Sequence, residues 1–586
     1  MGGILYFASL GRLPLLEPDE GRNAEVAREM LTTGDFITPH YNGFAYLDKP
    51  VVYFWLVAAS MRIAGMNEWA ARLPSALMAF ATTFLVWFLA RRMLGNGSGR
   101  RAAIIFATAP LTLAFSRIVI FDMTLAFLVT LAMVSFWLAQ ESDFRRPAFD
   151  VVFFAAMGVA AITKGPVGFL LPLLSALAFQ GVTGRLRDWR RFRWGIGLVV
   201  FLAAALPWFV AVSMQHPDLP RYAFWDESLR RFATASTRRG GSILYYVPIY
   251  LSGFFPWSLF LLYAGLGKLR DWRKLREASW WSIAFLLAWT GVIFVFFTIS
   301  RSKLPGYFLP AIVPLSILTA KAWEEIEAED GRPPGWLRAG FLTMVVLGVI
   351  VAALPQAFRL ETVALAAERK ASPAVLALIK PAMFYSGVIL AAMGVFGRNL
   401  ATRRAGRNRA GASFALLALT VPLLVVRWGA ALTAHADARS SRRLARAIMR
   451  GPEKDLTIYG FYCFRTGLPF YLGRPVGLVT SAGSELTSNY IVATLARRRS
   501  SGAARVSEKK AGGEADLLDA EGLRARARGA TAPFLVLVRN RDVQMLARTV
   551  PAMEPMWSEW EYSVWKIPAG PSEVTGDRGE GTGKKP

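Results

Sequence analysis

Long apolar blocks separated by short charged loops restrict the fold of this chain more than any other feature. About thirteen blocks precede residue 433, and many approach the twenty residues that a helix needs to cross a bilayer. They cover approximately residues 1–16, 70–90, 102–116, 119–139, 150–163, 165–181, 195–214, 246–266, 279–299, 304–320, 339–355, 380–396 and 411–430. The first block is short for a span, which favours a helix that begins upstream. The pattern predicts an α-helical polytopic membrane protein with about thirteen transmembrane helices.

The composition agrees with this class. Of 586 residues, 54% are hydrophobic, and the net charge of +27 comes from clusters between the apolar blocks. A nucleic-acid-binding protein would carry such charge on a soluble face, so nucleic acid is not expected as a partner. The single cysteine, Cys463, excludes an intrachain disulfide, and three histidines argue against a multi-histidine metal site. Met1–Leu10 lacks the basic start and the cleavage site of a signal peptide.

The basic residues also predict an orientation. If consecutive apolar blocks cross the membrane in opposite directions, the loops between them fall into two sets, one on each side. One set is dense in Arg and Lys, and membrane proteins keep such loops in the cytoplasm. This set comprises residues 91–101, 145–146, 185–193, 267–276, 321–338 and 397–409. The other set comprises residues 17–68, Arg117, Lys164, 215–245, 300–303, 356–379 and everything after 433. We therefore expect a multi-pass membrane protein with the second set of loops on the outer side; the resemblance given below implies that this membrane is the bacterial inner membrane and that this side is periplasmic.

The first outer loop, residues 17–68, has internal structure of its own. Asp19 is suited to N-cap a helix from about Glu20 to Leu31, which Gly34 would end. Pro50 is suited to the first turn of a second helix, which ends near Arg62. That segment is apolar, contains Trp and Tyr, and is too short to span a bilayer. We predict that it lies in the membrane interface.

A different composition begins near residue 433. Short strand-like runs appear at 456–460, 476–480, 534–539 and 562–567, with helical patterns between them. These runs predict a small periplasmic α/β domain over residues 433–570, after a transmembrane domain over residues 1–432. Residues 496–513 have the composition of a flexible insertion, and residues 571–586 that of a disordered tail.

Ionisable residues inside or beside apolar blocks need an explanation, because charge in a membrane is costly and is usually functional or paired. Asp122 could act in catalysis, N-cap a helix, or pair with Arg117. Lys164 could serve a site or extend its ammonium group to the membrane surface. Lys303 and Tyr307 could bind a phosphate between them or anchor a helix in the interface.

The acidic pair Asp19-Glu20 likewise admits two interpretations. It could open a surface helix, where acidic residues favour the helix dipole, or it could take part in a reaction. The combined pattern favours a site, since carboxylates and cations from separate loops are all predicted on one side of the membrane. Cations there would bind a departing lipid phosphate, and a carboxylate would activate an acceptor.

Six motifs in order carry a family resemblance. They are PDEGRNAEVAREML at 18–31, Asp48-Lys49-Pro50, SRIVIFDMTLAFL at 116–128, TKGPVGFLLP at 163–172, YAFWDESLRRF at 222–232 and KLPGYFLPAIVPLSIL at 303–318. With them the chain resembles the ArnT-like and protein O-mannosyltransferase-like glycosyltransferases, families 39 and 83 of the GT-C superfamily. It is most similar to those that add aminoarabinose to lipid A. The resemblance implies a GT-C fold, an undecaprenyl (polyprenyl) phosphate sugar as donor, and inverting transfer on the periplasmic face.

The resemblance also assigns residues. Asp19, Asp122 and Glu20 would form the reaction centre, and the residues implied to hold the donor phosphate are Arg22, Lys49, Lys303, Tyr307 and Arg231. Two positions depart from the aminoarabinose transferases, because Asp48 replaces a Glu and Ser228 replaces a His. In relatives that Glu and His can share a divalent metal. A metal at Asp48, the sugar, and the acceptor (lipid A, another glycan or a protein) therefore stay open.

A lipid or sugar transporter is the alternative from another class. Transporters often show internal repeats with paired broken helices, and we find neither pattern in this sequence. The predicted charges also gather on one face of the membrane instead of at its middle.

Overall fold

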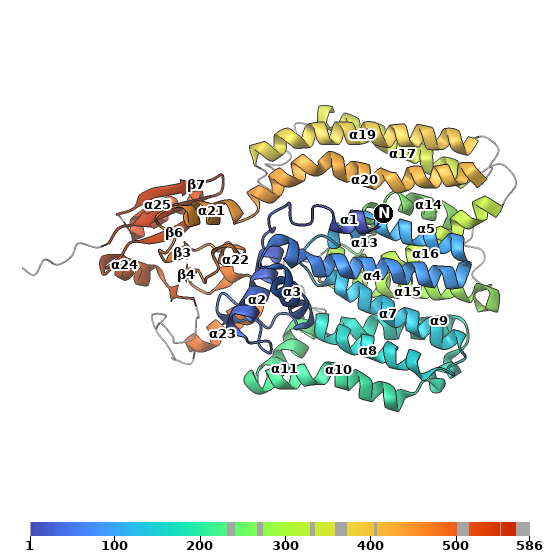
Figure 1. Cartoon of the computed structure of the whole chain (residues 1–586), viewed down its shortest axis with the longest axis horizontal. Helices are drawn as coiled ribbons and strands as arrows, with labels where there is room; N and C mark the ends of the chain where they lie inside the picture. Colours follow the sequence, from blue (N-terminus) through green and yellow to red (C-terminus); the bar gives the residue numbers. More distant parts are fainter. Residues whose placement is uncertain are drawn as a thin grey trace, which may run out of the picture. The chain divides into compact units, whose positions relative to one another are not determined.

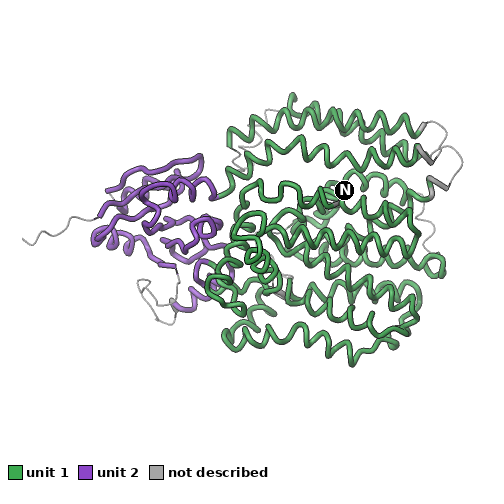
Figure 2. The backbone as a smooth tube through the Cα atoms, viewed as in Figure 1, with its two compact units in different colours: residues 1–41, 45–440 green, residues 42–44, 441–586 purple. Residues whose placement is uncertain are grey.

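The computed structural model describes residues 2–230, 241–266, 274–328, 334–357, 372–402, 407–500, 515–550 and 552–569. The chain divides into two compact units, residues 1–41 with 45–440 and residues 42–44 with 441–586 (Figure 2). The first unit is built from helices, and the second contains a six-stranded sheet. The domain boundary expected at 432/433 lies within helix α20, which continues to Ala438.

Nine helices in the described part of the first unit are long and apolar enough to cross a membrane. They are α4 (Glu68–Leu94), α7 (Asp122–Glu141), α8 (Pro147–Lys164), α10 (Trp194–Gln215), α15 (Trp281–Ile299), α16 (Leu309–Ala328), α17 (Gly335–Ala357), α19 (Pro373–Thr402) and α20 (Arg407–Ala438). A tenth span results if α13 (Tyr246–Gly253) and α14 (Trp257–Leu266), which meet at 114°, count as one. The predicted class, a multi-pass helical membrane protein, is confirmed.

The remaining apolar blocks form shorter helices, so fewer spans than thirteen meet the length criterion. These helices are α1 (Gly2–Phe7), α5 (Asn96–Thr108), α6 (Pro110–Phe115) and α9 (Val167–Val182). Pro110 divides the block 102–116, because the residue before a proline avoids the helical region and Ala109 is extended. Gly165, at φ 79°, separates α8 from α9. A Cβ at Gly168 would lie 2.3 Å from the Ala160 carbonyl, so the two helices pack closely.

The long helices run side by side (Figure 1). Helices α7 and α16 form the centre, where about four fifths of their apolar stretches are buried. Helices α10, α17, α19 and α20 instead expose most of theirs, including Val199, Val349 and Val426. Such large exposed apolar faces mark an interaction surface, and here the surface matches the hydrocarbon of a bilayer.

The first outer loop contains both predicted helices, α2 (Asp19–Thr33) and α3 (Val52–Ala64), and the short strands β1 (His40–Tyr41) and β2 (Phe44–Ala45). Gly34 ends α2 at φ 75°, and its N–H donates to the Met30 carbonyl. One detail differs, because α2 starts at Asp19 itself and Pro18 occupies the N-cap without a side-chain cap. The Asp19 carboxylate instead pairs with Arg22. The remaining short elements of the unit are η1 (Leu186–Arg191), α11 (Leu219–Arg221), η2 (Tyr222–Arg230), η4 (Ala278–Trp280) and η5 (Pro305–Phe308), of which η2 and η5 carry site residues.

The second unit is an α/β fold. Its sheet has the order β5-β4-β3-β6-β8-β7, with β3 parallel to β4 and β6. The strands are β3 (Ile458–Phe461), β4 (Gly477–Val479), β5 (Leu517–Leu518), β6 (Phe534–Arg539), β7 (Glu554–Ser558) and β8 (Tyr562–Ile567). The helices and turns are α21 (Arg442–Arg450), α22 (Leu468–Leu472), η6 (Ser484–Leu486), α23 (Asn489–Ser500), α24 (Ala520–Arg528), η7 (Asn540–Asp542) and α25 (Val543–Thr549).

All four strand-like runs predicted in this unit form strands, whereas β5 and β7 were not predicted. Strand β5 has only two residues, and β7 is a largely exposed edge strand that contains Pro555. Alternate residues of β6 face opposite sides, so Leu537 packs among residues of α21 and α22, and Val536 among residues of α24 and α25. Of the predicted insertion, residues 496–500 belong to α23, and the rest lies outside the described residues. The predicted tail 571–586 also lies outside them.

Candidate active site

Most of the predicted site residues come from loops at one end of the first unit. Helices α4 and α7 begin at the end of the first unit where α8 and α10 finish (Figure 1). The loop helices α2 and α3 lie at this same end. Side-chain contacts between residues 40 to 180 positions apart in sequence join these loops. Charged residues that are distant in the chain thereby become neighbours.

Asp122 and Lys164 form a buried ion pair in this region. Lys164 Nζ lies 2.5 Å from Asp122 Oδ1, and the two side chains are only 8% and 5% exposed. The same ammonium lies 4.5 Å from the centroid of the Tyr307 ring and 5.1 Å from that of Phe121. A Cβ at Gly306 would lie 2.7 Å from Asp122 Oδ1, so only glycine lets the Tyr307 loop approach so closely.

This geometry resolves the alternatives for the charges in this region. Asp122 pairs with Lys164, and the expected pairing of Asp122 with Arg117 is wrong. Arg117 instead donates to the carbonyls of Leu5 at 2.8 Å and Ala8 at 2.6 Å. Asp122 is the first residue of α7 and makes no N-cap bond. Lys164 does not extend to the surface, because its ammonium is buried against a carboxylate and two rings.

Lys49 approaches the same Phe121 ring. Its ammonium lies 5.9 Å from the Phe121 centroid and forms an ion pair with Glu227 of η2. Both side chains of this pair are largely buried, at 19% and 14% exposure. Two ammonium groups, those of Lys49 and Lys164, therefore lie within 6 Å of one aromatic ring, each with a carboxylate partner.

Asp48 accepts a hydrogen bond of 2.6 Å from the Tyr222 hydroxyl. Burial, and next to it the Asp48 carboxylate, hold the pKa of Tyr222 well above its usual range, so the phenol remains a donor. Within the described residues, no group of three or more His, Cys, Asp or Glu side chains is arranged to hold a metal ion. The described side chains around Asp48 do not fit the predicted divalent metal, and the Ser228 side chain lies outside the described part.

Asp19 and Arg22 form a further ion pair, on successive turns of α2. Arg22 is buried and lies 5.7 Å from the centroid of the Tyr46 ring, whereas Asp19 is 47% exposed. Burial raises the pKa of Tyr46, nearby Arg22 lowers it, and Asp48 raises it. The Tyr46 hydroxyl therefore lies within electrostatic range of the Asp19–Arg22 pair on α2 and of Asp48, and so connects α2 to the Asp48 loop.

A shallow pocket lies beside Asp19. Its walls are the segment Leu16–Glu20 and the segment Ile118–Ile120, which directly precedes Phe121. Asp19 is the predicted carboxylate with the greatest exposure in this pocket, so an acceptor group arriving from solvent can reach it.

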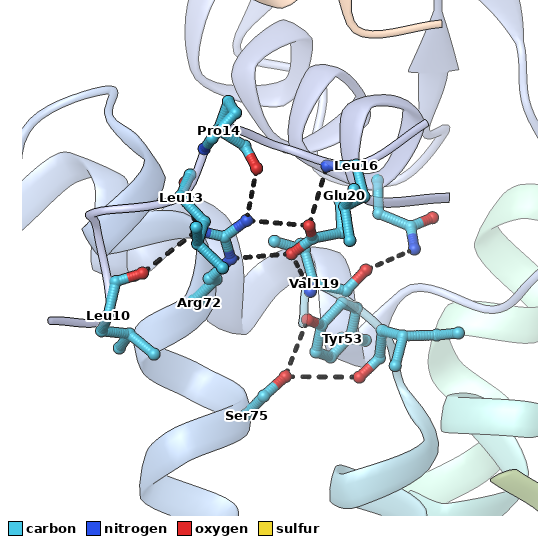
Figure 3. A network of polar contacts seen from close by, with 11 residues as sticks. Leu10, Leu13, Pro14, Leu16, Glu20, Tyr53, Arg72, Ser75 and Val119 are labelled. Carbon is cyan, nitrogen blue, oxygen red and sulfur yellow. Dashed lines mark hydrogen bonds and ion pairs between the residues drawn. The ribbon is translucent and has the colours of Figure 1, made fainter. Parts of the chain in front are cut away.

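The Glu20 carboxylate lies in a network of hydrogen bonds that joins separate parts of the chain (Figure 3). Its Oε1 accepts from Arg72 Nε at 2.8 Å and Val119 N at 3.0 Å, and its Oε2 accepts from Arg72 Nη2 and Leu16 N, both at 2.8 Å. Arg72 also donates to the carbonyls of Leu10, Leu13 and Pro14. These bonds join α2 to α4 and to two loops. Both carboxylate oxygens of Glu20 are occupied, which favours an anchoring role, and its catalytic role stays a prediction.

Lys303 is also used by the scaffold. Its ammonium donates to the carbonyls of Phe297 at 3.2 Å, Thr298 at 2.7 Å and Ser300 at 2.5 Å, at the C-terminus of α15. Three acceptors match the three N–H groups, which favours a helix-capping role for Lys303, and its phosphate role stays a prediction. Arg231 lies outside the described residues.

Four residues of this arrangement were not among the predicted site residues. They are Tyr46, Lys164, Tyr222 and Glu227. Three of the four stand inside the quoted motifs TKGPVGFLLP and YAFWDESLRRF, and that signal could have identified them.

A bundle of long apolar helices, with loops at one end that carry paired cations and carboxylates, and a separate α/β unit, defines the class of the chain as a polytopic helical membrane protein. The fold is similar to the crystal structure of ArnT from Cupriavidus metallidurans bound to undecaprenyl phosphate. The TM-score is 0.78 at 27% identity, covering 97% of this chain and 98% of that chain. The apo structure of the same protein gives a TM-score of 0.79 at 26% identity.

Sequence comparison gives the same result. Residues 48–229 match the family described as dolichyl-phosphate-mannose-protein mannosyltransferase. The undecaprenyl phosphate-alpha-4-amino-4-deoxy-L-arabinose arabinosyl transferase 1 of Pseudomonas fluorescens is 34% identical over 324 residues, 54% of this chain and 57% of the relative. Its counterpart in Edwardsiella ictaluri is 34% identical over 348 residues, 58% of this chain and 60% of the relative. The chain spans about three fifths of the length of these curated relatives. The resemblance to ArnT-like glycosyltransferases is confirmed.

Proposed function

We propose that this protein transfers a sugar from an undecaprenyl (polyprenyl) phosphate donor to an acceptor of the lipid A type, with inversion at the sugar carbon. One observation carries the proposal. Lys49 and Lys164 approach the same Phe121 ring, and Tyr307 and Asp122 contact Lys164. The donor phosphate fits this end of the helical unit, and its polyprenyl chain fits among the apolar helices.

The two lysines have hydrogen-bond donors to offer to a phosphate. Each ammonium carries three N–H groups, and its carboxylate partner takes one. Both lie in largely buried surroundings, where charge–charge attraction is stronger than in water. As the bond between sugar and phosphate breaks, negative charge grows on the phosphate. Cations already in position stabilise that charge without reorganising.

The two predicted catalytic aspartates have different environments and therefore different proposed roles. Asp122 is buried against Lys164 and holds that cation in position. Asp19 is half exposed beside the pocket and is available to an acceptor. If the acceptor is a hydroxyl, Asp19 takes its proton. If the acceptor is a phosphate of lipid A, no proton is removed and Asp19 orients it.

The identity of the sugar is inferred from the curated relatives, and the orientation in the membrane from the basic loops. The curated relatives are named for transfer of 4-amino-4-deoxy-L-arabinose, which makes an aminopentose the first donor to test. The basic loops at residues 91–101 and 145–146 lie at the opposite end of the helices from the site. The positive-inside rule then assigns the site and the α/β unit to the periplasmic side of the bacterial inner membrane.

Reconstituted transfer tests the proposal. In proteoliposomes with an undecaprenyl-phosphate aminopentose donor and lipid A, Lys49→Gln and Lys164→Gln are each expected to lower kcat/KM by about 100-fold, as loss of one transition-state donor does. Arg92→Gln, at an exposed pair with Glu141, is the matched control and should retain activity. Undiminished transfer by both lysine variants would refute the proposal, and so would failure of the unmodified protein to use any polyprenyl-phosphate sugar.

A further inference from the structure

The α/β unit contains a reversal of strand order that the proposed transfer does not use. From β3 the chain proceeds outward to β4 and β5, and then returns to place β6 on the other side of β3. Both neighbours are parallel to β3. In open sheets of this kind the reversal leaves a crevice at the carboxyl ends of the two central strands, and ligands bind there. Here those strands are β3 and β6.

Two arginines stand at this edge. Phe461 pairs with Val538 across the parallel ladder, so the two strands end at the same level. Arg539 is the last residue of β6, and Arg465 lies in the loop that follows β3. The guanidinium groups come from segments more than 70 positions apart in sequence.

The loop after β3 has a defined conformation. A Cβ at Gly460 would lie 2.1 Å from the Cys463 carbonyl oxygen, so the chain turns back tightly over a position that only glycine allows. Tyr462 adopts φ 46°, and its N–H donates to Val479 on the next strand. The Cys463 thiol donates to the Leu537 carbonyl at 3.5 Å. These contacts fix where the loop delivers Arg465.

Both arginines meet one phenol. Arg465 Cζ lies 4.7 Å from the centroid of the Tyr562 ring, and its Nε donates to Ser441 Oγ at 3.4 Å. Arg539 is the cross-strand partner of Tyr562, so its side chain lies beside the same phenol and interacts with it electrostatically. Arg465 is only 7% exposed. Two guanidinium groups around one ring therefore share an enclosed position, with Glu561 acting electrostatically on Arg539.

We propose that Ser441, Arg465, Arg539 and Tyr562 bind an oxyanion, a phosphate or carboxylate group, at the carboxyl ends of β3 and β6. The chemistry of the side chains supports this class of ligand. Guanidinium groups present planar pairs of N–H donors that match both anions, and the phenol and the Ser441 hydroxyl add further donors. A bound oxyanion also offsets the repulsion between two neighbouring cations. The proposal is independent of the transfer reaction.

The only cysteine of the chain makes the test site-specific. Cys463 is 1% exposed and belongs to the loop that carries Arg465. The intact protein in detergent is treated with N-ethylmaleimide, and modification of Cys463 is followed by mass spectrometry at constant ionic strength. Inorganic phosphate is expected to slow the modification saturably, by about tenfold at ten times its Kd, because the occupied site holds the loop closed. Acetate and chloride are the comparison anions, and protection by phosphate or acetate but not by chloride identifies the oxyanion class.

Variants separate the site from general stabilisation. Arg539→Gln and Arg465→Gln should each remove the phosphate dependence, while Arg541→Gln, at a neighbouring exposed arginine, should keep it. If Arg465→Gln does not fold, the loss of phosphate-dependent Cys463 protection in Arg539→Gln and Tyr562→Phe tests the proposal instead. Lys49→Gln should lose transfer but keep Cys463 protection, so failure here is distinguishable from failure of the transferase proposal. Equal protection by chloride, or phosphate protection that persists in Arg539→Gln, would overturn the inference.

Discussion

Buried ion pairs determine how individual residues at the site tolerate change. Removing one partner of such a pair leaves an uncompensated charge, which costs far more than the pair itself contributes. The pairs of the described site region are Asp122–Lys164, Glu227–Lys49, Asp19–Arg22 and Glu20–Arg72. The first three present a cation to a possible phosphate, whereas the fourth only joins segments of the chain.

The Glu20–Arg72 pair gives the sharpest stability prediction. Arg72→Gln leaves the Glu20 carboxylate buried with its main partner removed, and we expect a loss of about 3–5 kcal/mol. The measurement is thermal unfolding in detergent. Arg92→Gln breaks a pair whose side chains are 56% and 37% exposed, and its effect should stay below about 1 kcal/mol. Similar shifts for the two variants would show that the network does not anchor α2.

The sequence could predict which residues carry charge near the site but not how they pair. Asp122 has Arg117 five positions away and Lys164 forty-two positions away, and the fold selects the distant one. Glu20 stands next to Asp19 and shares its chemistry, yet one side chain is buried in a saturated network and the other is half exposed. Spacing along the chain contains no information on either choice, because the first depends on how α7 packs against α8 and the second on where α2 places Glu20 relative to Arg72 of α4.

At the scale of elements, Lys303 tests whether a cation in a site motif serves the site or the helix. It donates to three carbonyls at the end of α15. Lys303→Gln should therefore lower the unfolding free energy by about 1.5–3 kcal/mol, the usual worth of hydrogen bonds to a charged group, and leave the donor KM unchanged. Lys49→Gln should instead raise the donor KM, and it should also lower the unfolding free energy because it removes the Lys49 partner of the buried Glu227 carboxylate. A raised donor KM for Lys303→Gln would support its predicted phosphate role.

The connection between the segment 35–40 and the end of α10 should depend on pH. Thr38 Oγ1 donates to Gln215 Oε1 at 2.6 Å and lies 3.2 Å from His216 Nε2. Burial lowers the pKa of His216; neighbouring His40 also lowers it, while Asp218 and Asp35 raise it. Because the pKa of His216 is lower in the folded state, folding favours the neutral imidazole over the charged one. That stability is present above the ordinary histidine pKa of 6.5 and is lost as the pH falls through the folded value.

Hydrogen exchange of the segment 35–40 measures this effect. After correction for intrinsic rates, exchange should be faster at pH 5 than at pH 7.5, and His216→Gln should abolish the difference. His40→Gln, which removes the neighbouring histidine, is the control and should retain it. A pH dependence that survives His216→Gln would assign the effect to another group.

At the scale of the whole molecule, the bilayer makes helices easy to locate from sequence and their breaks hard to locate. Each apolar block became helical, because backbone groups in hydrocarbon must be satisfied within their own segment. The 114° bend between α13 and α14 was not predicted, although Pro256 lies at the break and cannot continue a helix hydrogen-bond ladder. Nor could the sequence indicate the order of the six strands, since pairing partners come from distant segments.

Orientation is the property of the whole molecule on which the proposed reaction depends. The site loops and the basic loops lie at opposite ends of the long helices, so one labelling experiment assigns both. In a Cys463→Ser background, Thr32→Cys lies at the site end and Asn96→Cys at the basic end, and both positions are exposed. A membrane-impermeant maleimide added to spheroplasts should label Thr32→Cys at once and Asn96→Cys only after permeabilisation.

The reverse labelling pattern would place Lys49 and Lys164 on the cytoplasmic side, where a periplasmic acceptor could not reach them. The lipid-phosphate chemistry of the paired cations would still stand, since it depends only on their mutual geometry. The acceptor would then have to be sought among cytoplasmic-leaflet lipids. Labelling of both cysteines before permeabilisation would contradict α4 as a membrane span, because Thr32 and Asn96 lie on either side of its 27 residues.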